Sequence, residues 1–115
     1  MWTPPAEGSL AAAIAKAAPG ARVVKGFNTF GAEFHKEPGR AGVPADVYLA
    51  GDDMEAKKRV MEVATQAGFR PIDAGPLRNA SVLENLAMLW IHLATVGGQG
   101  RDFTFTMRSR TNAGP

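Results

Sequence analysis

Hydrophobic residues change their spacing from one segment of the chain to the next, and this spacing predicts alternating helices and strands. Short apolar runs rich in β-branched residues predict buried strands, at residues 21–27, 46–51 and 70–73. Apolar residues at helical spacing predict helices before and between them, at residues 10–18, 29–35 and 53–67. This order is typical of an α/β protein with about three core strands and flanking helices.

The helix expected at 53–67 separates apolar from charged residues. Its inner face is expected to carry apolar side chains, namely Val60, Met61, Val63, Ala64 and Ala67. Charged side chains are expected mostly on the outside, namely Lys57, Lys58, Arg59 and Glu62. Asp52 or Asp53 is expected to cap its first turn, and Ser9 to cap helix 10–18.

The most hydrophobic segment, residues 81–96, predicts a long apolar helix that begins with a capping box formed by Ser81 and Glu84. Apolar residues occupy nearly every face of this helix, so it is expected to be covered on nearly every side. A domain of this size offers too little structure for that, and we therefore expect a homodimer that pairs through helix 81–96. After the helix, the alternation in residues 102–107 predicts a last short strand.

Prolines, glycines and small polar residues mark the two ends of the chain. Residues 1–8 are expected to form a loop or to be disordered, residues 9–110 to form one domain, and residues 111–115 to be a disordered tail. The first residues have neither a basic start nor an apolar core, and no segment is apolar for long enough to span a bilayer. The chain has no cysteine, which fits a reducing compartment. We therefore expect a cytoplasmic protein without a membrane partner.

Charge gives little indication of a nucleic-acid partner. The 115 residues carry a formal net charge of +2, and the basic residues are scattered. The densest basic group, which consists of Arg101, Arg108 and Arg110, is expected to be a solvated tail. We expect no nucleic-acid binding.

Residues that act in catalysis or metal binding are missing at useful spacings. His35 and His92 are far apart and lack ligand-type neighbours, so no metal site is predicted. His92 is expected to be a core or interface residue, and His35 a surface loop residue. Asp52 and Asp53 are better explained as helix caps than as an acid–base pair. The sequence therefore predicts no catalytic residue.

One class of chemistry remains compatible with these absences. The glycine-rich run at 97–100 follows a helix, so it does not have the position of a phosphate-binding loop. Hydride transfer between two bound cofactors needs alignment and exclusion of water more than a protein acid. Small and polar residues at the end of the strand 21–27 offer a surface for it: Asn28, Thr29, Gly31 and Ala32. In open α/β sheets, ligands bind at the carboxyl ends of strands.

Three motifs in order carry a resemblance to a known family. Residues 23–29 (V-V-K-G-F-N-T) resemble a V-V-K-A-F-N-T signature, residues 51–60 a G-D-D-x-x-A-K-x-x-V element, and residues 68–77 a G-F-x-P-V-D-A-G-x-L element. With the apolar helix, they resemble the carboxyl-terminal half of the NADPH-dependent deazaflavin (coenzyme F-420) reductase family. The reductase domain of the six-transmembrane metalloreductases is similar. The resemblance covers about residues 9–108.

The resemblance implies part of a Rossmann-type NAD(P)-binding fold, with NADP as one cofactor and a deazaflavin or flavin as the other. In the family, the F-N-T segment lies where the nicotinamide and the second ring meet. This role carries over to five positions: Asn28, Thr29, Gly31, Ala32 and Glu33. Gly26 stands where the family usually has alanine. The family's opening strand, G-x-G-x-x-G loop and helix have no counterpart here, so we expect a truncated oxidoreductase that is inactive alone.

Two other interpretations stay open at this point. Strand, G-D-D and helix also occur in hydroxyacid dehydrogenase-like Rossmann domains, which need a catalytic lysine in a following helical domain. The third interpretation is a non-enzymatic α/β module whose function is dimerisation through helix 81–96.

Overall fold

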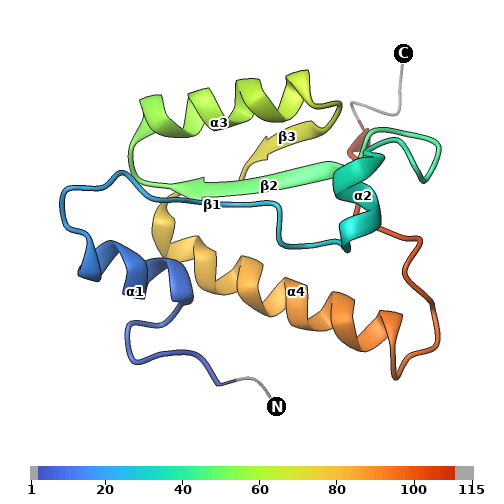
Figure 1. Ribbon diagram of the computed structural model, residues 1–115, viewed down its shortest axis with the longest axis horizontal. Coiled ribbons are helices and arrows are strands. Elements are labelled where there is room, and N and C mark those ends of the chain that lie inside the picture. The colour runs from blue at the N-terminus through green and yellow to red at the C-terminus, as the bar shows by residue number, and fades with distance from the viewer. Residues whose placement is uncertain (1–2, 111–115) are drawn as a thin grey trace.

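A three-stranded sheet separates two layers of helices in the computed structural model, which describes residues 3–110 (Figure 1). The strands lie in the order β1, β2, β3, with bounds Val24–Lys25, Asp46–Gly51 and Arg70–Asp73. Helix α3 covers one face, while α1 and α4 lie on the other and α2 stands at one end. Their bounds are Leu10–Ala17 for α1, Ala32–Lys36 for α2, Met54–Gln66 for α3 and Ala80–Ala94 for α4. The α/β class and the three core strands predicted from the sequence are confirmed.

The central strand β2 is the most buried element of the fold. It pairs in parallel with β3, with Asp46 opposite Arg70, and it pairs antiparallel with β1, with Lys25 opposite Ala50. Val47 and Leu49 are fully buried. They belong to a core cluster that also contains Phe30, Phe34, Ala45, Ala64 and Phe69. Burial on both faces explains why β2 reads as a continuous apolar run in the sequence.

Strand β1 is shorter than the predicted strand 21–27, because the chain changes direction after Gly26. A Cβ atom at Gly26 would lie 2.2 Å from Leu49 Cδ2, so the alanine usual in the family would require the Leu49 side chain to move. Phe27 then adopts a φ of 60°, which is unusual for a bulky residue. Its ring packs edge-on against Phe69 at 5.5 Å, and this contact offsets the backbone strain. The strained turn ends the strand.

Helix α3 confirms one predicted cap and contradicts part of its predicted faces. Asp53 Oδ1 accepts a hydrogen bond from Ala56 N at 2.8 Å, as an N-cap does. Lys57, which was expected outside, is only 2% exposed, whereas Val63, which was expected inside, is 61% exposed. Apolar spacing alone did not locate the edge of the buried face.

Buried Lys57 connects the ends of two neighbouring strands. Its Nζ donates to Gly51 O at 3.2 Å and to Gly75 O at 3.0 Å. It also forms an ion pair with Asp73 Oδ1 at 2.8 Å, and this contact lowers the pKa of the Asp73 carboxyl. A buried ammonium is stable only when its donors are paired, and here three oxygens pair with it.

The predicted capping box of Ser81 and Glu84 is wrong. A short 3-10 helix, Leu77–Asn79, leads directly into α4, which begins one residue before Ser81. The Glu84 carboxylate instead accepts hydrogen bonds from Leu10 N at 2.8 Å and Ala11 N at 3.2 Å. It therefore caps α1, together with the predicted cap Ser9, whose Oγ accepts from a backbone N–H one turn later. A carboxylate at a helix N-terminus also interacts favourably with the helix dipole.

Helix α4 is covered on one side only. Leu83 and Trp90 are buried, whereas Val82, Leu89 and Ile91 are 63%, 47% and 47% exposed. His92, which was expected in a core or an interface, is exposed in this chain. The single chain therefore leaves part of this helix open, as expected for a domain of this size, and whether a second copy covers the open side stays a prediction. No helix within residues 3–110 is both long and apolar enough to cross a membrane.

The prediction of a last strand at residues 102–107 is also wrong. This segment has no strand pairing, and with Arg101 it forms what we call the C-terminal strap, residues 101–107. Side chains from the sheet and from α4 form hydrogen bonds with the backbone of the strap at every second residue. Trp90 Nε1 donates to Phe103 O and Tyr48 OH donates to Phe105 O, both at 3.0 Å. Met107 N donates to Asp46 Oδ2 at 2.6 Å. The period-two alternation in the sequence reflects these contacts and not a sheet.

Replacing Glu84 by Ala is expected to lower the free energy of unfolding by about 3 kcal/mol, because a buried charge partner is lost. The change removes the cap of α1 and leaves Lys25, whose Nζ lies 3.4 Å from the Glu84 carboxylate, without this partner. Urea denaturation followed by circular dichroism measures the difference. Glu62→Ala on the exposed side of α3 is the control and should change the value by less than about 0.5 kcal/mol. Equal stability of the two variants would contradict the prediction.

Tyr48 should make stability fall at high pH. Burial, together with the nearby Asp46 carboxylate, raises the pKa of Tyr48 to about 12. The unfolded value is about 10, so the stabilising contribution is complete below about pH 10 and is lost as the pH rises toward 12. The chain has one tyrosine, so phenolate absorbance reports on this group alone. Tyr48→Phe should remove this part of the pH dependence, and a titration near 10 in the folded chain would show the prediction to be wrong.

Candidate functional site

The five residues expected to form the cofactor surface lie on one short segment, residues 28–33, which follows β1 and includes the first turn of α2. Asn28 Nδ2 donates to Leu83 O of α4 at 2.9 Å. Thr29 is 2% exposed, and Gly31 is the N-cap residue of α2. Ala32 is exposed and Glu33 is half-buried. The segment therefore lies against α4, with Asn28 anchoring it.

The antiparallel direction of β1 determines at which edge of the sheet this segment lies. Because β1 runs antiparallel to β2, its carboxyl end points toward the beginning of β2. The carboxyl ends of β2 and β3 meet at the other edge. The general rule that ligands bind at a shared carboxyl edge therefore does not locate residues 28–33, and contacts with α4 and the strap define their surroundings instead.

Two buried oxygen atoms of this segment have no hydrogen-bond partner among the described residues. They are Asn28 Oδ1 and Glu33 Oε1. Buried polar atoms are nearly always paired, because an unpaired one loses its hydration without compensation. Both atoms are acceptors, and Asn28 has its amide nitrogen engaged by Leu83 O. A partner for either oxygen has to be a hydrogen-bond donor.

The C-terminal strap touches the segment through Arg101. Arg101 Nε donates to Glu33 Oε2 at 2.9 Å, and its guanidinium lies 5.3 Å from the centre of the Trp90 ring. The hydrogen bond from Arg101 holds the pKa of the Glu33 carboxyl below its ordinary value. A Cβ atom at Gly31 would lie 2.6 Å from Arg101 Nη2 and 2.9 Å from Trp90 Cη2. The absence of a side chain at Gly31 is therefore required for this close packing.

Aromatic rings pack on the core side of the same segment. Phe30 stacks on Phe69 with ring centres 5.4 Å apart and an interplanar angle of 9°. His35 is exposed, as expected, but it lies on α2 and its ring contacts Phe30 edge-on at 4.9 Å. Within residues 3–110, no three His, Cys, Asp or Glu side chains gather at distances suited to a metal ion. The environment of His35 is therefore that of a packed ring.

Of the two aspartates of the G-D-D element, Asp53 caps α3 as expected for one of the pair. Asp52 Oδ1 instead accepts from Leu77 N at 2.9 Å, at the first residue of the 3-10 helix. Both side chains therefore bind backbone N–H groups near the carboxyl ends of β2 and β3.

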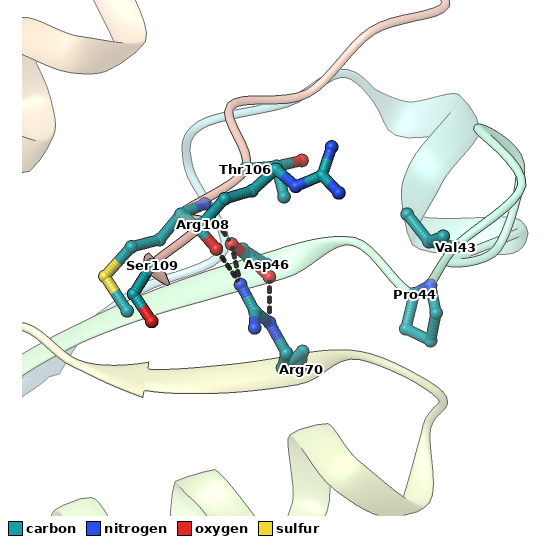
Figure 2. A pocket seen from close by; sticks show the side chains of 8 residues that line it. Val43, Pro44, Asp46, Arg70, Thr106, Arg108 and Ser109 are labelled. Carbon is teal, nitrogen blue, oxygen red and sulfur yellow. Dashed lines mark hydrogen bonds and ion pairs between the residues drawn. The ribbon is translucent and has the colours of Figure 1, made fainter. Parts of the chain in front are cut away.

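A hollow of about 350 Å³ lies at the beginning of β2 and β3, where sequence reasoning placed no site (Figure 2). Asp46 and Arg70, the first residues of these strands, form a two-point ion pair with distances of 2.6 and 2.9 Å. The pair raises the pKa of Arg70 above its ordinary value. The sequence signal was available, since a charged residue opens each of two neighbouring buried strands. None of the residues 28–33 lines this hollow.

Comparisons with known proteins point to reductases. No protein-family model matches the chain. Over 75 residues, it is 34% identical to mouse metalloreductase STEAP2, 35% to human STEAP2 and 36% to rat STEAP3. Each match covers 65% of this chain and 15% of the relative. The crystal structure of a putative F420-dependent NADP reductase from Arthrobacter sp. FB24 has a TM-score of 0.81 and 34% identity, over 88% of this chain.

The chain spans 46% of the Arthrobacter protein and a much smaller share of the metalloreductases. The sequence matches and the structural match are to the same kind of protein as the three motifs indicated. By sequence and fold, the chain is similar to part of a putative F420-dependent NADP reductase and to part of the metalloreductases, and both likenesses support the resemblance to the carboxyl-terminal half of that reductase family.

Proposed function

We propose that the chain is part of an NADP-dependent oxidoreductase that transfers a hydride between NADPH and a deazaflavin or flavin. Two observations on relatives support this proposal: the curated matches are metalloreductases, and the structural match is a putative F420-dependent NADP reductase. The sequence contains no glycine-rich loop that opens a helix, so the residues that hold the pyrophosphate would come from elsewhere.

The observation that carries the proposal is the pair of unpartnered acceptors on residues 28–33. Asn28 Oδ1 and Glu33 Oε1 are buried without a donor, and the Asn28 amide cannot turn freely because Nδ2 is bonded to Leu83 O. The carboxamide of nicotinamide and the pyrimidine ring of a flavin or deazaflavin both carry N–H donors. The donors that these residues lack are therefore those that the two cofactors present, and the residues fit the cofactors.

In this proposal, the chain supplies alignment and a dry surface. Asn28 and Glu33 would hold N–H groups of the rings, and the small, exposed Ala32 would allow close approach of a planar group, while Gly31 lets Arg101 and Trp90 pack closely beside them. Thr29 is buried and fixes the backbone between them. Asn28 and Glu33 would hold the two rings against each other, so that a bound NADPH would supply the hydride that the second ring accepts. Trp90 and the strap would keep water away from the rings, because Phe103 stacks on Trp90 at 5.2 Å.

A chimera tests the role of Asn28. In it, residues 9–108 of this chain replace the matching part of the Arthrobacter protein, and we expect NADPH oxidation with a deazaflavin or flavin acceptor. Asn28→Ala should lower kcat by about tenfold to a hundredfold and change the KM for NADPH by less than about threefold, because alignment is lost more than binding. Asn85→Ala, at an exposed position of α4, is the matched control.

Equal losses in kcat and in NADPH affinity would contradict the assignment of Asn28, and an inactive chimera that is folded would contradict the proposed function.

The chain alone should bind NADPH weakly or not at all, because backbone amides of a glycine-rich loop normally hold the pyrophosphate. Calorimetric titration of the chain checks this expectation, and micromolar binding would contradict it.

We also propose that the chain forms a homodimer through α4. Apolar residues recur on its open side at spacings of four, three and four residues, at Val82, Leu86, Leu89 and Leu93. This spacing is that of two helices that pack along a seam. At about 25 cal/mol per Å², burial of 400 Å² of apolar surface gives on the order of 10 kcal/mol before association costs.

Charged residues on this seam should prevent dimerisation. Val82→Lys combined with Leu89→Lys places two ammonium groups on side chains that are 63% and 47% exposed, so the fold of the single chain should tolerate them. Sedimentation should show a dimer for the unchanged chain and a monomer for the double variant. Val63→Lys, an equally exposed apolar position on α3, should leave the dimer intact. A monomeric unchanged chain would rule the dimer out.

A further inference from the structure

The hollow at the beginning of β2 and β3 combines positive charge with an apolar wall (Figure 2). Its volume of about 350 Å³ is at the lower end of the range for small-molecule sites. It is lined by Val43, Pro44, Asp46, Arg70 and residues 106–109. It shares no lining residue with the cofactor surface proposed above, so it is an independent site.

One guanidinium in the hollow is held rigidly. Arg70 donates through Nε and Nη2 to the Asp46 carboxylate, and Nη2 also donates to Met107 O. Among the described residues, no hydrogen bond engages Nη1, and the Arg70 side chain is 41% exposed. A guanidinium whose orientation is already fixed loses little conformational entropy when it binds an anion.

The negative charge of Asp46 is already compensated by the protein. Its carboxylate is fully buried and accepts from Arg70, from Met107 N at 2.6 Å and from Tyr48 OH at 3.4 Å. The ion pair cancels the charge of one arginine. Arg108, which lines the hollow from the strap side, adds a further positive charge, so the net charge of the lining is positive.

The opposite wall of the hollow is apolar and open to solvent. Val43 is 56% exposed, and Pro44 lies beside it (Figure 2). Exposed apolar side chains beside a fixed guanidinium suit a ligand that has both a charged and an apolar end. A bare inorganic anion would leave this wall in water.

We infer that the hollow binds a small carboxylate that carries a short aliphatic tail. The carboxylate would lie between Arg70 and Arg108, with a guanidinium on each side. The tail would lie against Val43 and Pro44. Carboxylate and guanidinium form charge-assisted hydrogen bonds, which are stronger than neutral ones.

Titration of the isotope-labelled chain with butyrate, followed by amide chemical shifts, tests this inference. Saturable shifts are expected at Val43, Thr106 and Ser109. Arg108→Gln should weaken butyrate binding by about tenfold, the effect of one lost charge-assisted hydrogen bond. Val43→Asp should weaken it to a similar extent, because the tail would meet a charge. Arg59→Gln, at an exposed position of α3, is the matched control and should leave the affinity unchanged.

Butyramide and inorganic phosphate distinguish the two halves of the inference. Butyramide has the same tail without the charge, and phosphate has the charge without the tail; both should bind at least fivefold more weakly than butyrate. Equal binding of butyramide would overturn the role of the arginines, and equal binding of phosphate would overturn the role of the apolar wall. An absence of saturable shifts with butyrate would overturn the site itself.

Discussion

Full burial of the Asp46 carboxylate is the constraint from which much of the structure follows. A carboxylate at the first position of a central strand needs several hydrogen-bond donors, since its desolvation is otherwise uncompensated. The neighbouring strand supplies Arg70, and strand β2 itself supplies Tyr48. The remaining donor is Met107 N, which lies 61 residues away in the sequence. Satisfying one buried charge therefore brings the end of the strap to the beginning of the sheet.

Because Met107 is held at the beginning of β2, the preceding residues of the strap pass along α4. Phe103 meets Trp90 there, and Arg101 reaches Glu33. The strap thus connects the start of the sheet to the segment at residues 28–33, with few contacts of its own backbone to other backbone groups. Side chains that recognise an extended peptide replace the ladder of a fourth strand.

Local patterns in the sequence predicted those features that depend on neighbours in the chain. The strand 46–51 followed from a continuous buried run, and the caps Ser9 and Asp53 followed from short side chains before helical segments. The segment at residues 28–33 followed from motif order, and the structure keeps its five proposed residues together.

Long-range pairing explains what the sequence did not predict. Glu84 had the spacing of a local cap, yet it caps α1, more than seventy residues away. Lys57 lay within a charged run, yet oxygens of Gly51, Gly75 and Asp73 compensate its burial. Nothing local signals such partners, because each depends on where the sheet brings distant strand ends. The antiparallel direction of β1 is of the same kind.

The composition of α4 follows from the two surfaces that it presents. One side buries Leu83 and Trp90, and the carbonyl of Leu83 orients the amide of Asn28. The side that carries Val82 and Leu89 faces away from these contacts and is left open by residues 3–110. Because α4 is apolar on both sides, one side can hold the proposed cofactor segment while the other side remains available to pack against a second copy of the chain. Because the two surfaces use different residues, changes on the seam should leave the Asn28 hydrogen bond in place.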